Sequence, residues 1–102
     1  MIPATELQMA LHEYQAWGEK LRTPREVRLA AMLPHRNSHE IAVIMTACKE
    51  VEDFSWEIAK AVNDDGLTQP EAQEKIRLRF PFMSAENLSR TFGLAMYYTL
   101  KL

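Results

Sequence analysis

Hydrophobic positions recur along the chain with the three- and four-residue spacing of amphipathic helices. The most regular segment is 38–63, where the inward positions of a seven-residue repeat are Ile41, Ile44, Cys48, Val51, Ser55, Ile58 and Val62. Such a broad and regular face predicts a long helix that is packed by several neighbours. No segment alternates like a half-buried strand over more than a few residues. The pattern therefore predicts an all-α fold.

Capping signals divide the chain into five predicted helices. The predicted N-caps are Thr5, Thr23 (with Pro24 as the first helical residue), Asn37 or Ser38, Thr68 and Ser84. The predicted stops are Pro34, the cluster at 63–66 and Pro81. The helices should span residues 5–21, 24–33, 38–63, 69–79 and 85–101. We expect one compact domain, residues 1–102, built around the long central helix at 38–63.

Composition narrows the classes of protein that fit. The chain has 102 residues, of which 47% are hydrophobic, enough for one core. Its only cysteine, Cys48, excludes an internal disulfide and falls on the apolar face, so we expect a buried thiol. The apolar stretches 41–48 and 91–100 are shorter than the ~20 residues of a membrane span. Residues 1–19 lack the layout of a signal peptide, so we expect a cytoplasmic protein.

Charge is unevenly distributed along the sequence. The net charge is −2 overall, but it is +4 over residues 20–36, −7 over residues 40–74 and +4 over residues 75–102. The basic segments could pair with the acidic central helix, which is the interpretation that we favour. Alternatively, they could form a basic patch that meets an anionic partner.

Catalytic and metal-binding signals are weak. His35 and His39 are four residues apart and Glu40 follows, but the predicted helix start at Asn37 or Ser38 places His35 in a loop. A metal protein or enzyme built on these side chains is our least favoured hypothesis. No nucleophile and base share a recognisable motif. We therefore expect no catalytic activity, metal or other cofactor.

A short segment resembles a DNA-binding element. Residues 68–92 fit the pattern helix, tight turn, helix, and 84–92 resembles the recognition-helix segment of arabinose-regulator-type transcription factors, Ser-x-x-x-Leu-Ser-Arg-x-Phe. The resemblance covers nine residues of 102. That family has a small alanine where this chain has Arg77, glycine where it has Pro81, and a second helix-turn-helix beyond; we assign no family. A helix-turn-helix regulator that reads DNA through Arg79, Asn87 and Arg90 is the alternative function.

The C-terminal segment points to a protein partner. From Phe92 to Leu102 the only charged residue is Lys101, so this helix is apolar on all sides. Because the helix at 38–63 should occupy the centre, part of the C-terminal helix should stay exposed, which is typical of interfaces. The expected partner-binding residues are Phe82, Met83, Leu94, Tyr97, Tyr98 and Leu100. The alternative is simple burial in the core.

The sequence thus favours a small helical adaptor or regulatory protein that binds a macromolecular partner, most simply a second copy of itself. The profile is typical of accessory proteins of phages, plasmids and bacterial operons.

Overall fold

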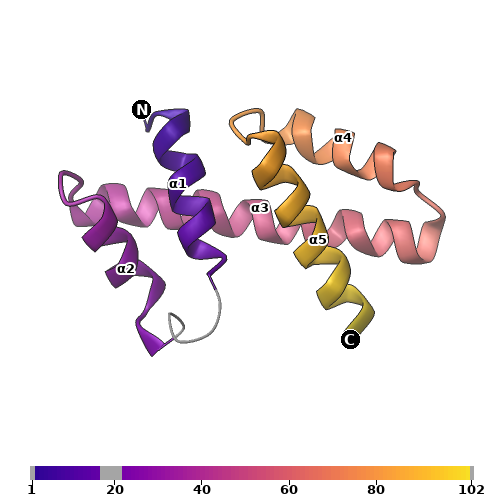
Figure 1. The fold of residues 1–102 in the computed structure, drawn as a ribbon, viewed down its shortest axis with the longest axis horizontal. Helices are drawn as coiled ribbons and strands as arrows, with labels where there is room; N and C mark the ends of the chain where they lie inside the picture. The colour runs from indigo at the N-terminus through magenta and orange to yellow at the C-terminus, as the bar shows by residue number, and fades with distance from the viewer. Residues whose placement is uncertain (1, 17–21, 102) are drawn as a thin grey trace. The chain divides into compact units, whose positions relative to one another are not determined.

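The computed structural model describes residues 2–16 and 22–101 (Figure 1). These residues form five helices and no strand. The helices are α1 (Ala4–Tyr14), α2 (Arg25–Met32), α3 (Ser38–Asp65), α4 (Gln69–Arg79) and α5 (Ala85–Lys101). The chain is therefore all-α, as the hydrophobic spacing predicts.

The residues gather into two compact units, Met1–Lys49 and Glu50–Leu102. The boundary falls inside α3, so this helix contributes residues to both. The first unit holds α1, α2 and the beginning of α3; the second holds the rest of α3, α4 and α5. The expectation of a single domain stays a prediction.

The buried face of α3 follows the predicted repeat over most of its length. Ile41, Ile44, Cys48, Val51 and Ser55 are buried. Toward the C-terminus the burial shifts to Ala59, and Ile58 and Val62 are only half-buried. The helix continues two residues beyond the predicted end at residue 63, and Gly66 follows it with a φ of 75°. This left-handed conformation is accessible to glycine without a steric penalty and is common just after a helix.

In the first unit, two arginines of α2 bind the end of α1. Arg25 donates from Nε to the carbonyl oxygen of Tyr14 over 2.9 Å, and its guanidinium lies 4.2 Å from the centre of the Tyr14 ring. Arg28 donates from Nη1 to the carbonyl oxygen of Glu13 over 3.1 Å. The last carbonyls of a helix have no intrahelical donor and carry partial negative charge, so they attract cations. These contacts accompany the close packing of α1 on α2.

The prediction of a first helix over residues 5–21 is wrong at both ends. The helix begins at Ala4, with Pro3 rather than Thr5 at the N-cap, and it ends at Tyr14. Its last turn closes with a tight bond from the Ala16 N–H to the carbonyl of Glu13 over 3.1 Å. Arg25 and Arg28 donate to the carbonyl oxygens of Tyr14 and Glu13, which would accept backbone N–H groups if the helix continued. Residues 17–21 of the predicted helix lie outside the described residues.

The start of α2 also differs from the prediction. Pro24 is the N-cap and Arg25 the first helical residue, so neither Thr23 nor Glu26 caps this helix. The carbonyl of Thr23 instead accepts a hydrogen bond from Nε of Arg28 over 3.1 Å. The helix ends at Met32, one residue earlier than predicted, just before Leu33 and Pro34.

Arg36 joins the first turn of α1 to the first turn of α3. It donates to both carboxylate oxygens of Glu6, over 3.0 Å and 2.6 Å, and to Glu40 over 2.8 Å. The predicted cap Asn37 is confirmed: its Oδ1 accepts from the Glu40 N–H, and its own N–H donates back to the Glu40 carboxylate. The hydrogen bonds from Arg36 lower the pKa of Glu6 to about 2. The pKa of Glu40 is also lowered, first by the Asn37 N–H and then by Arg36.

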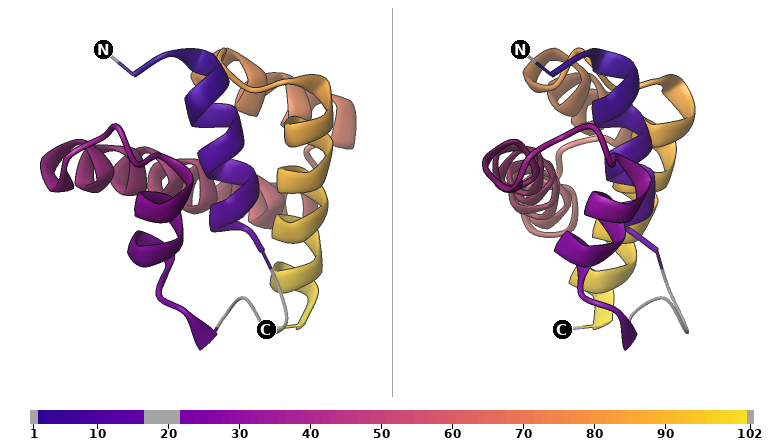
Figure 2. Two further views of the ribbon diagram at one scale, coloured as in Figure 1. Left: turned by 60° about the vertical axis from the view of Figure 1, so that its left-hand side comes forward. Right: turned by 90° about the vertical axis from the view of Figure 1, so that its left-hand side faces the viewer.

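In the second unit, local capping signals determine the helix starts. Thr68 and Glu71 form the predicted capping box at α4, and the Ser84 hydroxyl accepts from the Asn87 N–H at α5 over 3.1 Å. Between these helices, a turn closes through a bond from the Met83 N–H to the carbonyl of Phe80 over 3.2 Å. After this turn α5 packs against α4, as Figures 1 and 2 show.

An aromatic contact joins α3 to the end of α4. The Phe54 and Phe80 rings meet edge to face with centroids 5.7 Å apart. The Arg79 guanidinium lies 5.7 Å from the Phe54 ring centre and 5.4 Å from that of Phe80. At these distances a cation is attracted to the negative face of an aromatic ring.

The burial pattern along α4 allows a matched test of the hydrophobic core of the second unit. Ile76 is fully buried, whereas Leu78, two residues later, is 66% exposed. Replacing Ile76 by Ala should lower the free energy of unfolding by about 2–5 kcal/mol, because it removes buried methyl groups and leaves a cavity. Replacing Leu78 by Ala should change it by less than about 0.5 kcal/mol. Urea unfolding followed by circular dichroism measures both; equal losses would contradict this core.

The Glu6–Arg36 contact predicts a pH dependence of stability. The folded-state pKa of Glu6 is about 2, below its ordinary value of 4.5. The contribution of Glu6 to stability should therefore be complete above pH 4.5 and should disappear as the pH falls toward 2. The Glu6→Gln variant should be less stable at neutral pH and should lose less stability across this acid range. Parallel stability profiles of wild type and variant, measured by urea unfolding, would contradict the contact.

Candidate interaction surface on the C-terminal helix

Helix α5 has one buried face and one exposed face. The buried side chains are Asn87, Thr91, Phe92 and Ala95. Its end is held to α3 by a hydrogen bond from Nδ2 of Asn63 to Oγ1 of Thr99 over 2.9 Å. Because the buried residues follow helical spacing, α5 packs along one side, and its other side faces solvent.

The residues of the opposite side form a single row, which we call the exposed stripe of α5. Its members are Glu86, Ser89, Gly93, Tyr97 and Leu100, all of them exposed. The spacing of three, four, four and three residues places them one above another on the helix surface. Small residues occupy its middle, and large ones follow toward the C-terminus.

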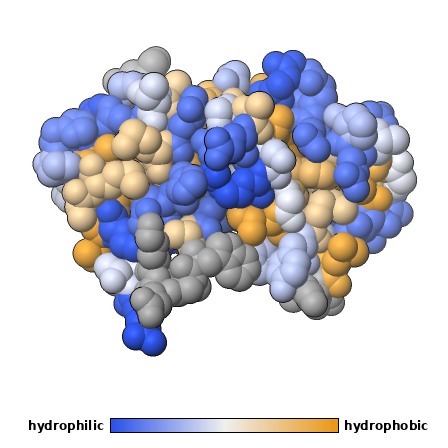
Figure 3. Space-filling view, viewed as in Figure 1, coloured by the Kyte–Doolittle hydropathy of each residue, from blue (hydrophilic) through white to orange (hydrophobic). Residues whose placement is uncertain are grey.

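The C-terminal half of the stripe is unusually apolar for an exposed surface. Tyr97 is 50% exposed and Leu100 is 71% exposed. Tyr98 stands beside them, with its ring edge to face with that of Tyr97 and the centroids 5.5 Å apart. Hydrophobic residues reach the surface in the region of α5 in Figure 3. Tyrosine combines a large apolar ring with a polar hydroxyl, which is why it is enriched at protein interfaces.

The other predicted partner-binding residues are less accessible. Met83 is 8% exposed, and the Thr91 hydroxyl lies 4.0 Å from its sulfur. It therefore cannot contribute a surface side chain, because the turn at 80–83 directs it toward α5. Phe82 is half-buried and meets the Phe80 ring edge to face, with centroids 6.4 Å apart. Leu94 is also half-buried, at the border of the exposed face.

Of the three residues of the DNA-binding alternative, Arg79 is exposed, Arg90 is half-buried and Asn87 is buried. Arg79 lies over the rings of Phe54 and Phe80. Asn87 is buried, and Arg90 donates a hydrogen bond from Nη2 to its Oδ1. A residue that reads bases must present its polar groups to the major groove, so this arrangement weighs against the alternative.

The candidate metal and thiol residues are dispersed. Among the described residues, no three histidine, cysteine or acidic side chains lie close enough to hold a metal ion. His35 Nε2 contacts the Glu6 carboxylate at 2.9 Å, and His39 is exposed. Cys48 is buried, as its position on the α3 repeat predicts.

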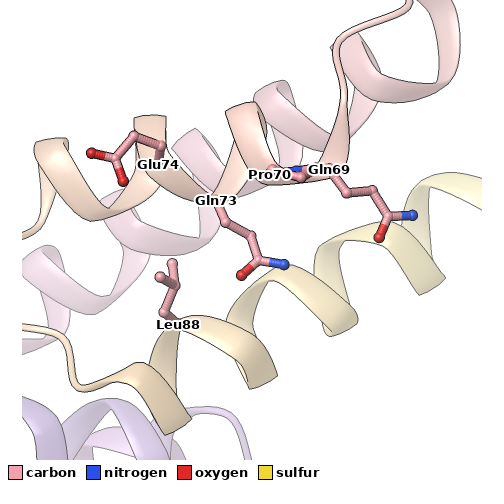
Figure 4. A pocket seen from close by; sticks show the side chains of 5 residues that line it. All are labelled: Gln69, Pro70, Gln73, Glu74 and Leu88. Atoms are coloured by element: carbon pink, nitrogen blue, oxygen red, sulfur yellow. The ribbon is translucent and has the colours of Figure 1, made fainter.

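A hollow of about 440 Å³ lies between α4 and α5. It is lined by Gln69, Pro70, Gln73, Glu74 and Leu88. Figure 4 shows the two glutamine side chains extending toward α5 and Leu88 rising from it. Two amides, one carboxylate and two apolar side chains supply neither a nucleophile nor a recognisable acid–base pair.

No family model, curated protein or solved structure matches the chain. Within residues 2–16 and 22–101, every helix is too short or too polar to cross a membrane.

The residues that the sequence analysis missed are Ser89 and Gly93. Neither has a hydropathy that distinguishes it, and only their helical spacing from Tyr97 and Leu100 connects them to the surface. Glycine inside a helix is unfavourable, because it loses more conformational freedom on folding than alanine does. At Gly93, apart from its chain neighbours and the backbone of the same helix, no described atom lies within 4 Å of the position that a Cβ would take. Packing within the described chain thus does not require glycine here.

Both Gly66 and Gly93 have open space for a Cβ, but their replacement by alanine should have opposite effects on stability. At low protein concentration, Gly93→Ala should raise the free energy of unfolding by about 0.5–1 kcal/mol, through helix propensity. Gly66→Ala should lower it by about 1–2 kcal/mol, because the positive φ strains an alanine even though space is open there. Urea unfolding measures both. Destabilisation by Gly93→Ala would show that this position is covered within the monomer.

Proposed function

We propose that this chain is a small cytoplasmic adaptor or regulatory protein that acts by binding, without catalysis, and that it first pairs with a second copy of itself. The observation that supports the proposal is the exposed stripe of α5. At the C-terminal end of the stripe Tyr97 and Leu100 are exposed to solvent, with the exposed Tyr98 beside them, and contiguous exposed apolar side chains usually mark an interaction site.

The order of residues in the stripe suits an antiparallel pair of α5 helices. If the two-fold axis passes near Gly93, Tyr97 of each copy lies opposite Ser89 of the other. A large side chain then enters the gap that small residues leave, as ridges enter grooves in packed helices. Such an interface is self-complementary, which is the property that a symmetric dimer requires.

The energetics favour reversible association. Buried tyrosines are among the residues that dominate binding energy at interfaces. The five residues of the stripe cover less than the ~800 Å² that each partner contributes to a standard interface. We therefore expect monomers and dimers to exchange, which suits a regulatory protein whose assembly depends on its concentration.

Charge substitutions in the stripe test the proposal. Tyr97→Glu and Leu100→Asp should shift the protein to monomer, because each would bury an unpaired charge at the contact. Leu78→Asp, at an exposed leucine of α4, is the matched control and should leave the dimer intact. Sedimentation velocity measures assembly, and circular dichroism checks folding. A monomeric wild type, or variants that lose helicity, would contradict the proposal.

Cysteine cross-linking tests the orientation of the pair. In an antiparallel pair centred on residue 93, Gly93→Cys should form a disulfide between copies under mild oxidation, and Leu100→Cys should not. A parallel pair would cross-link through both positions and would refute the antiparallel arrangement. Absence of cross-linking at both positions would remove the stripe as the interface. The wild type is the control, since its Cys48 is buried.

A further inference from the structure

A hollow between α2 and the beginning of α3 leaves apolar side chains in contact with solvent. It measures about 410 Å³, and its apolar lining consists of Val27, Ala30, Ile41, Ala42 and Met45. Val27 is 52% exposed, and both alanines are exposed as well. These residues all belong to the first unit, so the hollow is separate from the exposed stripe of α5. Exposed apolar side chains around a concave surface are typical of a binding site.

The shape of the hollow suits one face of a helix. The helices α2 and α3 diverge from the loop that joins them, as Figures 1 and 2 show. Along α3 the lining extends from Ser38 to Met45, which is a rise of about 10 Å, or two helical turns. A helix that docks in a groove uses apolar residues three, four and seven positions apart, which also cover about two turns. The hollow therefore has room for a row of such residues, with the buried side chain of Ile41 beneath them.

The charge is negative at the end of the hollow nearest to this loop. Arg36 lines this end, but its guanidinium donates to the carboxylates of both Glu6 and Glu40. Hydrogen bonds lower the pKa of both carboxyl groups, so both are ionised near neutral pH. While the neighbouring His35 is neutral, two carboxylates outweigh one guanidinium. This end of the hollow therefore attracts cations rather than anions.

The charge is also negative at the opposite end. Glu26 lines the hollow, is exposed and makes no hydrogen bond or ion pair within the described part of the chain. The two arginines of α2 have partners elsewhere, because Arg25 lies over the Tyr14 ring and Arg28 contacts Glu13. An exposed carboxylate beside an apolar surface favours a partner that carries a cation next to apolar residues.

We propose that this hollow is the docking site for a cationic amphipathic helix of a partner protein. Apolar residues of that helix pack on the lining of the hollow, and a Lys or Arg beside them pairs with Glu26. Apolar contact supplies most of the affinity, and the complementary charge excludes acidic helices. Such a helix is the macromolecular partner that the proposed adaptor function, on which this inference rests, requires in addition to the second copy on α5.

Model peptides test the charge of the occupant. The probe is a fluorescein-labelled peptide that contains Leu-Lys-Lys-Leu-Leu-Lys-Leu twice, and its binding is followed by fluorescence anisotropy at constant ionic strength. We expect saturable binding. A peptide with Glu in place of every Lys should bind more weakly by about tenfold or more. Absence of saturable binding, or equal binding of the acidic peptide, would overturn the proposal.

Two exposed valines test the location of the site. Val27→Lys places an ammonium group in the hollow and should weaken binding of the Lys peptide by about tenfold or more, because it disrupts the apolar contact and repels the cations. Val43, which is 46% exposed and lies outside the lining, is the matched control. Val43→Lys makes the same change of net charge and should alter the affinity by less than about twofold. Equal weakening by both substitutions would overturn the site.

Two exposed glutamates test the contact with the cation. Glu26→Gln should weaken binding by about two- to fivefold, because it removes an exposed ion pair. Glu57→Gln makes the same change of charge at an exposed position of α3 in the second unit and should leave the affinity unchanged. Circular dichroism checks that these exposed substitutions preserve the helices. Unchanged binding by Glu26→Gln would overturn the role of this carboxylate.

A variant with a disrupted stripe separates this site from the dimer. Tyr97→Glu, which should dissociate the pair of α5 helices, should bind the Lys peptide as the wild type does. Loss of peptide binding in this variant would assign the peptide to the stripe and overturn the present site. Loss of self-association in Val27→Lys would show that a second copy occupies the hollow, which would also overturn it. A monomeric wild type that binds the peptide would contradict the α5 interface and support this site.

Discussion

The length of α3 is the constraint on which the rest of the structure depends. A helix of 28 residues is about 42 Å long, whereas a domain of about 100 residues has a radius of gyration near ~13 Å. Each neighbouring helix is shorter: α1 and α4 have 11 residues and α2 has eight. Each of these helices is too short to cover the whole apolar face of α3. Burial is therefore divided between two local cores, each with its own set of short helices.

The two units use different chemistry to hold their helices. In the first unit, guanidinium groups of Arg25, Arg28 and Arg36 bind helix ends and carboxylates. These contacts satisfy backbone carbonyls that short helices leave unpaired. In the second unit, edge-to-face phenylalanines join α3 to the end of α4, and the Thr68 and Ser84 hydroxyls accept from N–H groups at the starts of α4 and α5. Arg25, Arg28 and Arg36 thus have structural roles, and the stability of the first unit should depend more on pH and salt than that of the second.

Local signals made the second unit predictable, and distant contacts made the first unit harder to predict. Thr68 and Ser84 cap helices through bonds to residues three positions away, so sequence motifs identify them. The end of α1 depends on Arg25 and Arg28, which are 11 and 15 residues beyond their acceptors. No motif encodes that contact, and the first helix was predicted too long. Helix periodicity, by contrast, correctly predicts the buried positions of α3 as far as Ser55.

Only part of the candidate surface could be predicted from the sequence, because it also depends on packing between residues that are distant in sequence. The lack of charge after Phe92 indicates that large apolar residues outnumber the places available in a core, which agrees with the exposure of Tyr97 and Leu100. Which side chains are exposed depends on how α5 is rotated about its axis. The sequence pattern predicts Met83 at the surface, whereas it is buried, because hydropathy alone does not distinguish a turn residue that points inward from one that points outward.

The rotation of α5 is itself specified by polar residues that take no part in the exposed stripe. Asn87 and Thr91 are buried on the opposite face, and the Ser84 cap holds the Asn87 N–H. Turning the helix would break the contact of the Thr91 hydroxyl with the Met83 sulfur and the hydrogen bond from Asn63 to Thr99, and buried polar groups without partners are costly. An apolar helix such as α5 could otherwise pack on several sides with similar energy. The polar contacts of Thr91 and Thr99 with neighbouring segments therefore favour the rotation in which Gly93, Tyr97 and Leu100 face solvent.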